Sequence, residues 1–224
     1  MPIPSEHALP RSRVLLRDMV YSRIVDAILG GQLKPGEILH DQDIEKWLQV
    51  SRTPIREALG ELAWQGLVEM EPNRFTRVAV PLPSEVADTM RTLGAMLAAA
   101  VHLAVPQLTP EMQKTANEAG ERLRSALQDR DLEGTLSSAF ALWQHYIDNC
   151  GNAVLQRIYN GASAGLAFRL RAAQEIDRQD AAFLLAHLEQ LLDSTNTGDG
   201  WAAKRAVETF HLLGEPATAV MHQA

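Results

Sequence analysis

The segment Val50-Ser51-Arg52-Thr53-Pro54-Ile55-Arg56-Glu57-Ala58-Leu59 carries the strongest structural signal in this sequence. Thr53 is a favourable helix N-cap, and Pro54 suits the first helical position, where no N–H group is needed. Apolar side chains then recur at helical spacing, at Ile55, Ala58, Leu59, Leu62 and Ala63. We therefore predict a helix that Thr53 caps and that runs from Pro54 to about Gln65, ended by Gly66.

Two further helices are predicted upstream of this segment. The apolar positions of residues 16–28 repeat every three or four residues, and the Gly30-Gly31 pair ends that helix. The stretch Lys34-Pro35-Gly36 then forms a turn. A second, shorter helix is expected at about residues 41–48, with three residues facing inward: Ile44, Trp47 and Leu48.

A β-hairpin is predicted downstream. Residues 67–70 and 75–80 are β-like runs, and the turn-forming stretch Glu71-Pro72-Asn73-Arg74 separates them. Pro81-Leu82-Pro83 closes the unit as a linker. Three helices and a hairpin within about 70 residues are typical of a winged helix-turn-helix, which we assign to residues 1–82.

Arg52 and Arg56 lie one helical turn apart, on the face opposite the apolar stripe. In a helix-turn-helix this helix presents its N-terminal turns to the major groove, where arginine binds guanine O6 and N7 or phosphates. The helix N-terminus favours phosphate, and Ser51 and Thr53 add hydroxyl groups there. These residues predict a DNA-contacting surface. The alternative is that both arginines are ordinary solvated helix residues.

The remainder of the chain, residues 83–224, shows no convincing strand pattern. Ser84 is expected to cap a first long helix, and Thr109-Pro110 to begin another. Further helical segments are predicted at residues 135–149, 152–173, 179–193 and 201–213, with breaks at Gly151-Asn152 and residues 194–200. The predicted fold class is therefore mostly α, with the winged unit followed by an all-helical bundle domain.

Composition narrows the class of protein. Hydrophobic residues make up 46% and aromatic residues 5%, which favours packed helices over disorder. The net charge of -7 is uneven, because residues 1–80 hold ten Lys and Arg against eleven Asp and Glu, and the rest hold eleven against seventeen. A near-neutral unit can still bind DNA if its arginines share one face. Without a signal peptide or a bilayer-length apolar stretch, and with Cys150 as the single cysteine, we expect a cytoplasmic protein with no membrane contact.

Residues 24–80 resemble the DNA-binding domain of the GntR family of bacterial repressors. The matching stretches are residues 31–36, residues 50–59 and Gly66-Leu67-Val68. The resemblance implies that Arg52, Thr53 and Arg56 contact the bases and phosphates of double-stranded operator DNA, and that the hairpin tip enters the minor groove. Asn73-Arg74-Phe75 replaces the family's arginine and glycine at that tip. We expect Arg74 to supply the minor-groove cation, Asn73 to take a left-handed turn, and Phe75 to pack beneath the wing.

Residues 84–224 resemble the helical ligand-sensing domain, FCD, of the FadR-like subgroup. The shared features are several helices, Arg91 on the first long one, the Gly151-Asn152 break, and two late histidines, His187 and His211. The resemblance implies a homodimer controlled by a small-molecule effector. Arg91 resembles an arginine that holds a carboxylate effector, since a buried guanidinium needs an anion. A salt bridge to a nearby acidic side chain is the alternative.

Many members of this subgroup bind a divalent metal through one Asp and three His, the first two in an Asp-x-x-x-His pattern. Here those two positions are Ala139 and Trp143, which cannot bind metal, while His187 and His211 match the other two. His145 points to another side of its helix, and two histidines alone make a poor zinc or nickel site. We therefore predict no metal there. We expect Trp143 to fill the space, and both histidines either to hydrogen-bond an effector or to be ordinary interior residues.

The leading functional interpretation is a repressor, or less often an activator, whose DNA affinity an effector shifts. A metal-dependent hydrolase on the helical bundle is one alternative, but its ligand set is incomplete, and HExxH, GxSxG, P-loop and GxGxxG motifs are absent. An effector-free DNA-binding scaffold is the other alternative. We therefore expect a regulator rather than an enzyme.

Overall fold

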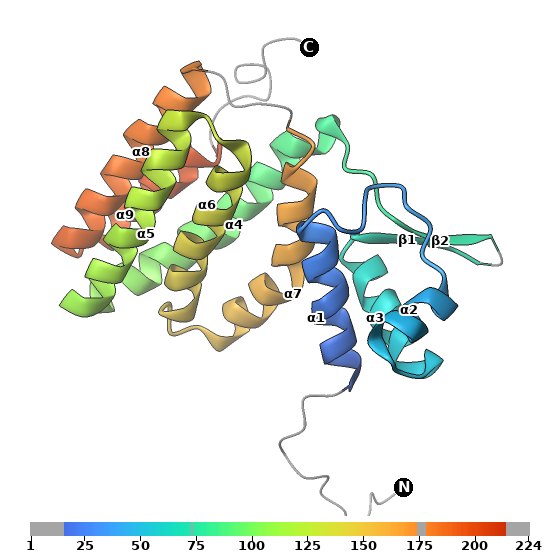
Figure 1. The fold of residues 1–224 in the computed structure, drawn as a ribbon. Helices are drawn as coiled ribbons and strands as arrows, with labels where there is room; N and C mark the ends of the chain where they lie inside the picture. The colour runs from blue at the N-terminus through green and yellow to red at the C-terminus, as the bar shows by residue number, and fades with distance from the viewer. Residues whose placement is uncertain (1–15, 73, 174–177, 214–224) are drawn as a thin grey trace, which may run out of the picture. The chain divides into compact units, whose positions relative to one another are not determined.

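A computed structural model describes residues 16–72, 74–173 and 178–213 of the chain. The chain divides into two compact units, Met1–Val80 and Pro81–Ala224 (Figure 1). Each unit has buried apolar residues of its own. None of the helices within the described ranges has the length and hydrophobicity that a bilayer crossing requires.

The N-terminal unit is the predicted winged helix-turn-helix. It contains helices α1 (Leu16–Leu29), α2 (Asp41–Leu48) and α3 (Arg52–Trp64), then strands β1 (Val68–Glu71) and β2 (Phe75–Val78). The strands pair antiparallel, with Val68 opposite Val78 and Glu69 opposite Arg77. Helix α3 packs against both α1 and α2. The buried core of this unit includes Ile24, Ile28, Ile55, Leu59, Leu62 and Val78.

Helix α3 begins two residues earlier than the sequence predicts. Ser51, with φ −75° and ψ 167°, is the N-cap, and Arg52 is the first helical residue, so the prediction that Thr53 caps this helix is wrong. Pro54 is tolerated at the third helical position because the N–H groups of the first turn have no intrahelical acceptor. The earlier start places Arg52 inside the helix rather than before it.

The prediction that Trp47 faces inward is also wrong. Trp47 is 47% exposed and Leu48 is half-buried, whereas Ile44 is the residue that α2 buries. Helix α2 has only 8 residues and ends at Leu48, and the C-cap residue Gln49, with a φ of 53°, turns the chain away. Such a short helix directs few side chains into the core, and Trp47 instead lines a surface hollow together with Met19 of α1.

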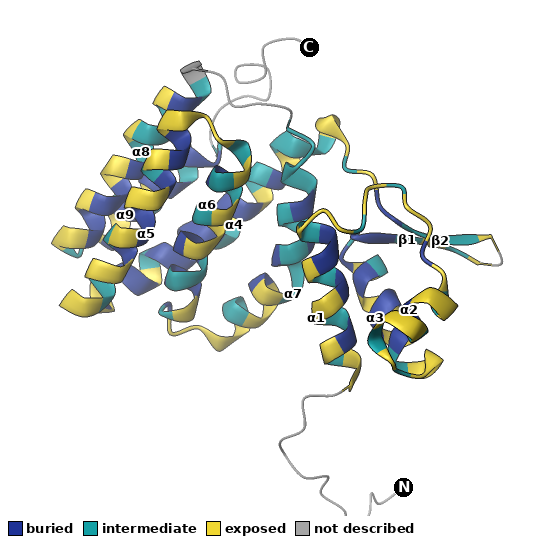
Figure 2. Cartoon of the chain, in the orientation of Figure 1, coloured by how far each residue is buried: buried dark blue, intermediate teal, exposed yellow. Residues whose placement is uncertain are grey.

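The C-terminal unit is all-helical in its described part, as predicted. The 3-10 turns η1 (Pro83–Glu85) and η2 (Val105–Gln107) flank its first long helix. The helices are α4 (Val86–Ala104), α5 (Pro110–Asp129), α6 (Leu132–Asp148), α7 (Ala153–Leu170), α8 (Arg178–Thr197) and α9 (Gly200–Phe210). Helix α4 packs against α6, α7 and α9, and the buried positions of these helices form one core (Figure 2).

Two N-cap predictions for this unit, Thr109 for α5 and Ser84 for α4, have different outcomes. Thr109 caps α5 as predicted, because its hydroxyl accepts a 3.3 Å hydrogen bond from the Met112 amide. Ser84 does not cap α4, and that prediction is wrong. It lies within η1, so that the chain is already helical there and Glu85 takes the N-cap position.

The predicted break at residues 194–200 is shorter in the structure, because α8 continues to Thr197. The hydroxyl of Ser194 donates to the Gln190 carbonyl, and that of Thr195 donates to the Leu191 carbonyl. These bonds reach back one turn, so polar side chains that favour loops in isolation are satisfied inside the helix.

Candidate DNA-binding interface and effector site

The two arginines of α3 point into solvent. The side chain of Arg52 is 61% exposed and that of Arg56 is 72% exposed, whereas Ile55 and Leu59 of the same helix are buried. Residues four apart lie on one face of a helix, so the two guanidinium groups share a surface that a duplex can approach. Ser51 and Thr53 are exposed at the same end.

Each of these arginines has an acidic partner on α2. Arg52 Nε donates to Glu45 Oε1 at 2.6 Å, and Arg56 Nε lies 3.7 Å from Asp41 Oδ2. A shallow hollow of about 440 Å³ beside them is lined by α2 residues and Arg52. Sequence analysis did not single out Asp41 or Glu45. Asp41 and Glu45 are four residues apart, as are Arg52 and Arg56, and this shared spacing could have indicated two ion pairs between adjacent helices.

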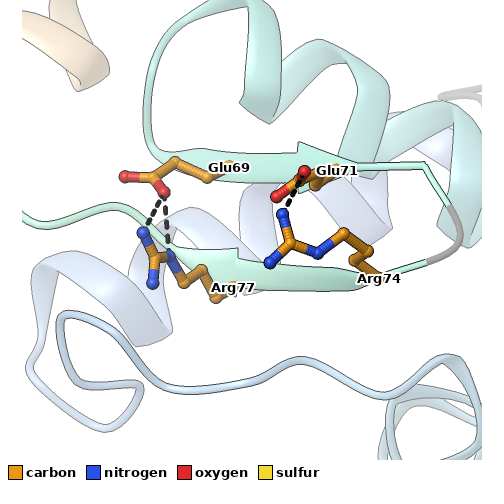
Figure 3. Close-up of polar contacts among 4 residues, drawn as sticks. All are labelled: Glu69, Glu71, Arg74 and Arg77. Atoms are coloured by element: carbon orange, nitrogen blue, oxygen red, sulfur yellow. Dashed lines mark hydrogen bonds and ion pairs between the residues drawn. The ribbon is translucent and has the colours of Figure 1, made fainter.

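The hairpin carries two more arginines, each beside a glutamate (Figure 3). Arg74 pairs with Glu71, and Arg77 contacts Glu69 Oε2 through Nε at 2.8 Å and through a terminal nitrogen at 2.6 Å. The Arg77 guanidinium also lies 4.6 Å from the centre of the half-buried Phe75 ring, a cation–π distance. Asn73, for which the sequence predicts a left-handed turn, lies outside the described residues.

Arg77 is a further candidate contact that sequence analysis missed. It stands directly opposite Glu69 in the hairpin register. The side chains of Arg74 and Arg77 are 68% and 39% exposed, so both are available at the surface of the wing. Glu69 and Glu71 offset the charge of these arginines, so the wing adds exposed guanidinium groups to those of α3 but no net charge.

In the helical unit, the structure brings Trp143 and His211 together. Their ring centroids are 5.1 Å apart, and both side chains are buried. His211 Nδ1 lies 2.9 Å from the Val207 carbonyl oxygen, as a hydrogen bond requires. Burial lowers the pKa of His211 to about 4, although the bond to Val207 acts in the opposite direction. His211 is therefore a neutral residue at pH 7.

The other two predicted effector residues have local partners. His187 is half-buried, with Nδ1 2.8 Å from the Phe183 carbonyl oxygen on its own helix. Arg91 pairs with Asp88 at 3.2 Å, and its side chain is 28% exposed. Arg91 is nevertheless one helical turn from Gly94, where a Cβ would lie 2.6 Å from His211 Cβ. The structure thus brings the Gly94 backbone of α4 against His211, whereas the Arg91 guanidinium, one turn earlier, lies on an acidic neighbour.

Thr135 is a candidate that sequence analysis overlooked. It is 8% exposed, and its hydroxyl oxygen has no hydrogen-bond partner within the described part of the chain. It lies four residues before Ala139 and eight before Trp143, so all three share one face of α6. A buried hydroxyl without a partner costs free energy, which makes this position suited to a polar ligand group.

The side chains at the subgroup's metal position do not fit a metal ion. Trp143 stands in a ligand position and packs its ring against His211 and Phe210, and half-buried Ala139 packs on the core. In the described ranges, no three His, Cys, Asp or Glu side chains gather as metal ligands would.

The winged helix and its exposed arginines define a DNA-binding protein with an all-helical second domain. Two family models match the chain: "Bacterial regulatory proteins, gntR family" over residues 16–78, and "FCD domain" over residues 88–211. The chain therefore belongs to the GntR family of transcriptional regulators, in the FadR-like subgroup that carries an FCD domain. These proteins are DNA-binding regulators and not enzymes.

Relatives along most of the chain support this assignment. The HTH-type transcriptional regulator Mce2R of Mycobacterium tuberculosis is 27% identical over 216 residues, which cover 89% of this chain and 90% of the relative. A probable D-xylose utilization operon transcriptional repressor of Paenarthrobacter nicotinovorans is 26% identical, covering 93% and 91%. The solved structure of E. coli McbR/YncC shares the fold, with a TM-score of 0.67 at 21% identity, covering 89% of this chain and 95% of that one.

Proposed function

We propose that this regulator is an effector-responsive repressor that binds a palindromic operator as a homodimer. The observation that carries the proposal is the outward position of Arg52 and Arg56 on α3, with 61% and 72% of their side chains exposed. Two-fold symmetric dimers of helix-turn-helix proteins bind half-sites about one helical turn apart. Some relatives are named as repressors, among them the D-xylose operon protein.

The DNA contacts divide by chemistry. Arg52 and Arg56 recognise guanine through O6 and N7, or bind the adjacent phosphates. Ser51 and Thr53 donate hydroxyl hydrogen bonds to phosphate at the N-terminus of α3, where the helix dipole also favours an anion. Arg74, at the tip of the wing, enters the minor groove. Arg77, three residues further along the chain in β2, binds phosphate.

The effector site lies in the helical unit, and its ligand is a small carboxylate. His211 is neutral, so we assign the positive charge of the site to Arg91, which exchanges Asp88 for the ligand carboxylate. Trp143 supplies an apolar wall, and Thr135 gives its unpartnered hydroxyl to a polar group of the ligand. His187 borders this site and offers Nε2 to the ligand, since its Nδ1 is bonded to the Phe183 carbonyl.

The DNA-binding part is tested with Arg56→Ala. An operator duplex is first selected from a random-sequence pool with the wild-type protein, and binding is then measured by gel shift. We expect Arg56→Ala to lose operator binding while its helix content and oligomeric state stay unchanged. Arg122→Ala, which removes an exposed arginine of α5, is the matched control. Wild-type affinity in Arg56→Ala would refute the assignment.

The effector part is tested by thermal shift against a panel of small carboxylates, since a ligand that binds the folded state raises the melting temperature. The shift should disappear in Arg91→Ala and shrink in Thr135→Val. If no carboxylate stabilises the wild type, the chain is better described as an effector-free DNA-binding scaffold.

A further inference from the structure

The arginines of α3 and the carboxylates of α2 form two matched pairs. Asp41 and Glu45 are one turn apart on α2, and Arg52 and Arg56 are one turn apart on α3. Glu45 lies 2.6 Å from Arg52, and Asp41 lies 3.7 Å from Arg56. The later carboxylate of α2 thus meets the earlier arginine of α3, and the earlier carboxylate meets the later arginine. On the wing, Arg77 likewise forms an ion pair with a carboxylate, that of Glu69.

All of these contacts use the same edge of the guanidinium group. Arg52 and Arg56 meet their carboxylates through Nε, and Arg77 does so through Nε and one terminal nitrogen. An arginine fork has five N–H donors in fixed geometry. A carboxylate at Nε leaves the terminal N–H groups of the arginine available for guanine O6 and N7. Arg52 makes a hydrogen bond to Glu45 through Nε, whereas Arg56 and Asp41, 3.7 Å apart, form an ion pair without a hydrogen bond.

These pairs are too exposed to be important for stability. The arginine side chains are 61% and 72% exposed, and water and salt screen ion pairs at that exposure. Their effect is on conformation, because an unpaired arginine on a surface samples many rotamers and loses that freedom on binding. A held side chain has already lost part of this entropy before DNA arrives.

The carboxylates also lower the attraction of this surface for DNA in general. Affinity for non-specific DNA comes almost entirely from contacts between cations and phosphates. Glu45 and Asp41 offset the charge of the two arginines that face the duplex, in a unit whose residues 1–80 hold ten basic and eleven acidic side chains. Sequence-specific hydrogen bonds then account for a larger share of the binding free energy.

We propose that Asp41 and Glu45 are positioning residues that set the DNA selectivity of this regulator. Glu45 holds Arg52 through a hydrogen bond to Nε, and Asp41 draws Arg56 toward α2 by charge alone, so that the terminal N–H groups of both arginines stay available for base edges. The charge of the two carboxylates also weakens binding to non-cognate DNA. This inference rests on the proposed DNA contacts of the two arginines.

The test compares dissociation constants for the selected operator and for a scrambled duplex of the same length, over a series of KCl concentrations, with the full-length protein. Selectivity is the dissociation constant for the scrambled duplex divided by that for the operator. In Glu45→Ala this ratio should fall about fivefold or more, which is the lower end of the discrimination that a bidentate base contact provides. Operator binding weakens, and scrambled-duplex binding strengthens by a few-fold. Asp41→Ala should change the ratio in the same direction.

Two further variants separate orientation from charge. Glu45→Gln keeps an oxygen acceptor for Arg52 Nε but removes the charge, so scrambled-duplex binding should strengthen while operator binding is retained. Asp43→Asn removes a charge from the same helix, but from a carboxylate that pairs with Lys46 at 3.6 Å and not with an arginine of α3. The selectivity ratio of Asp43→Asn should stay closer to the wild-type ratio than the selectivity ratio of Glu45→Ala does.

The outcomes distinguish this inference from the proposed function. A wild-type ratio in Glu45→Ala, with its fold verified by circular dichroism, would overturn the positioning role. An equal loss of selectivity in Asp43→Asn would also overturn it, because net charge alone would then account for the effect. If the wild type does not discriminate between the duplexes, or if Arg52→Ala keeps full operator affinity, the DNA-contact proposal itself fails.

Discussion

His211 makes the stability of the helical unit depend on pH. Its side chain is 1% exposed, and its ring lies 5.1 Å from that of Trp143 and 5.0 Å from that of Phe210. Burial disfavours the charged imidazolium and lowers the pKa of His211 from 6.5 to about 4. The folded protein therefore keeps this residue neutral over a pH range in which the unfolded chain protonates it.

Because the folded pKa lies below the unfolded one, the neutral histidine contributes stability that is fully present above pH 6.5 and is lost as the pH falls toward 4. At about 1.4 kcal/mol per pKa unit, this shift corresponds to about 3 kcal/mol of unfolding free energy. That is a large fraction of the ~5–15 kcal/mol by which domains are typically stable.

The assay is urea unfolding followed by far-UV circular dichroism at pH values between about 7 and 4.5. His211→Asn is the informative variant, because its amide nitrogen can replace Nδ1 as a donor to Val207 and does not titrate. We expect it to be less stable than the wild type at pH 7 but to lose less stability as the pH falls. His187→Gln, at a half-buried position, is the control and should keep the wild-type slope. Equal slopes in the wild type and His211→Asn would refute the argument.

Two further predictions concern the same unit. Gly94→Ala should destabilise it by about 1–3 kcal/mol through overpacking, because the new Cβ would lie 2.6 Å from His211 Cβ. In thermal melts its matched control, Gly161→Ala, should be neutral or stabilising, since nothing lies within 4 Å of the added Cβ, and equal melting temperatures would contradict the packing described. Elemental analysis of the purified protein should find no stoichiometric zinc or nickel, because Ala139 and Trp143 occupy two ligand positions, and one metal ion per chain would prove this wrong.

Local signals explain why much of the fold was predictable. The spacing of Ile55, Leu59 and Leu62 identified α3, and the Thr109-Pro110 pair located the start of α5. These features depend on neighbours within one or two turns. The errors came from segments where the local signal is ambiguous: both Ser51 and Thr53 can cap a helix, and the polar end of α8 resembles a loop until its hydroxyls find carbonyls one turn back.

By itself, the sequence determined the order and type of the elements and the outward face of Arg52 and Arg56, since these follow from residue type and spacing along one segment. The replacement of two metal ligands was read from the resemblance of residues 84–224 to the FCD domain. Only the tertiary structure decided that Glu45 and Asp41 meet those arginines, that Trp143 packs on His211, and that Trp47 stays exposed. The reason is physical: periodicity specifies which side of a helix is apolar, but the partner of each side chain depends on how separate helices pack.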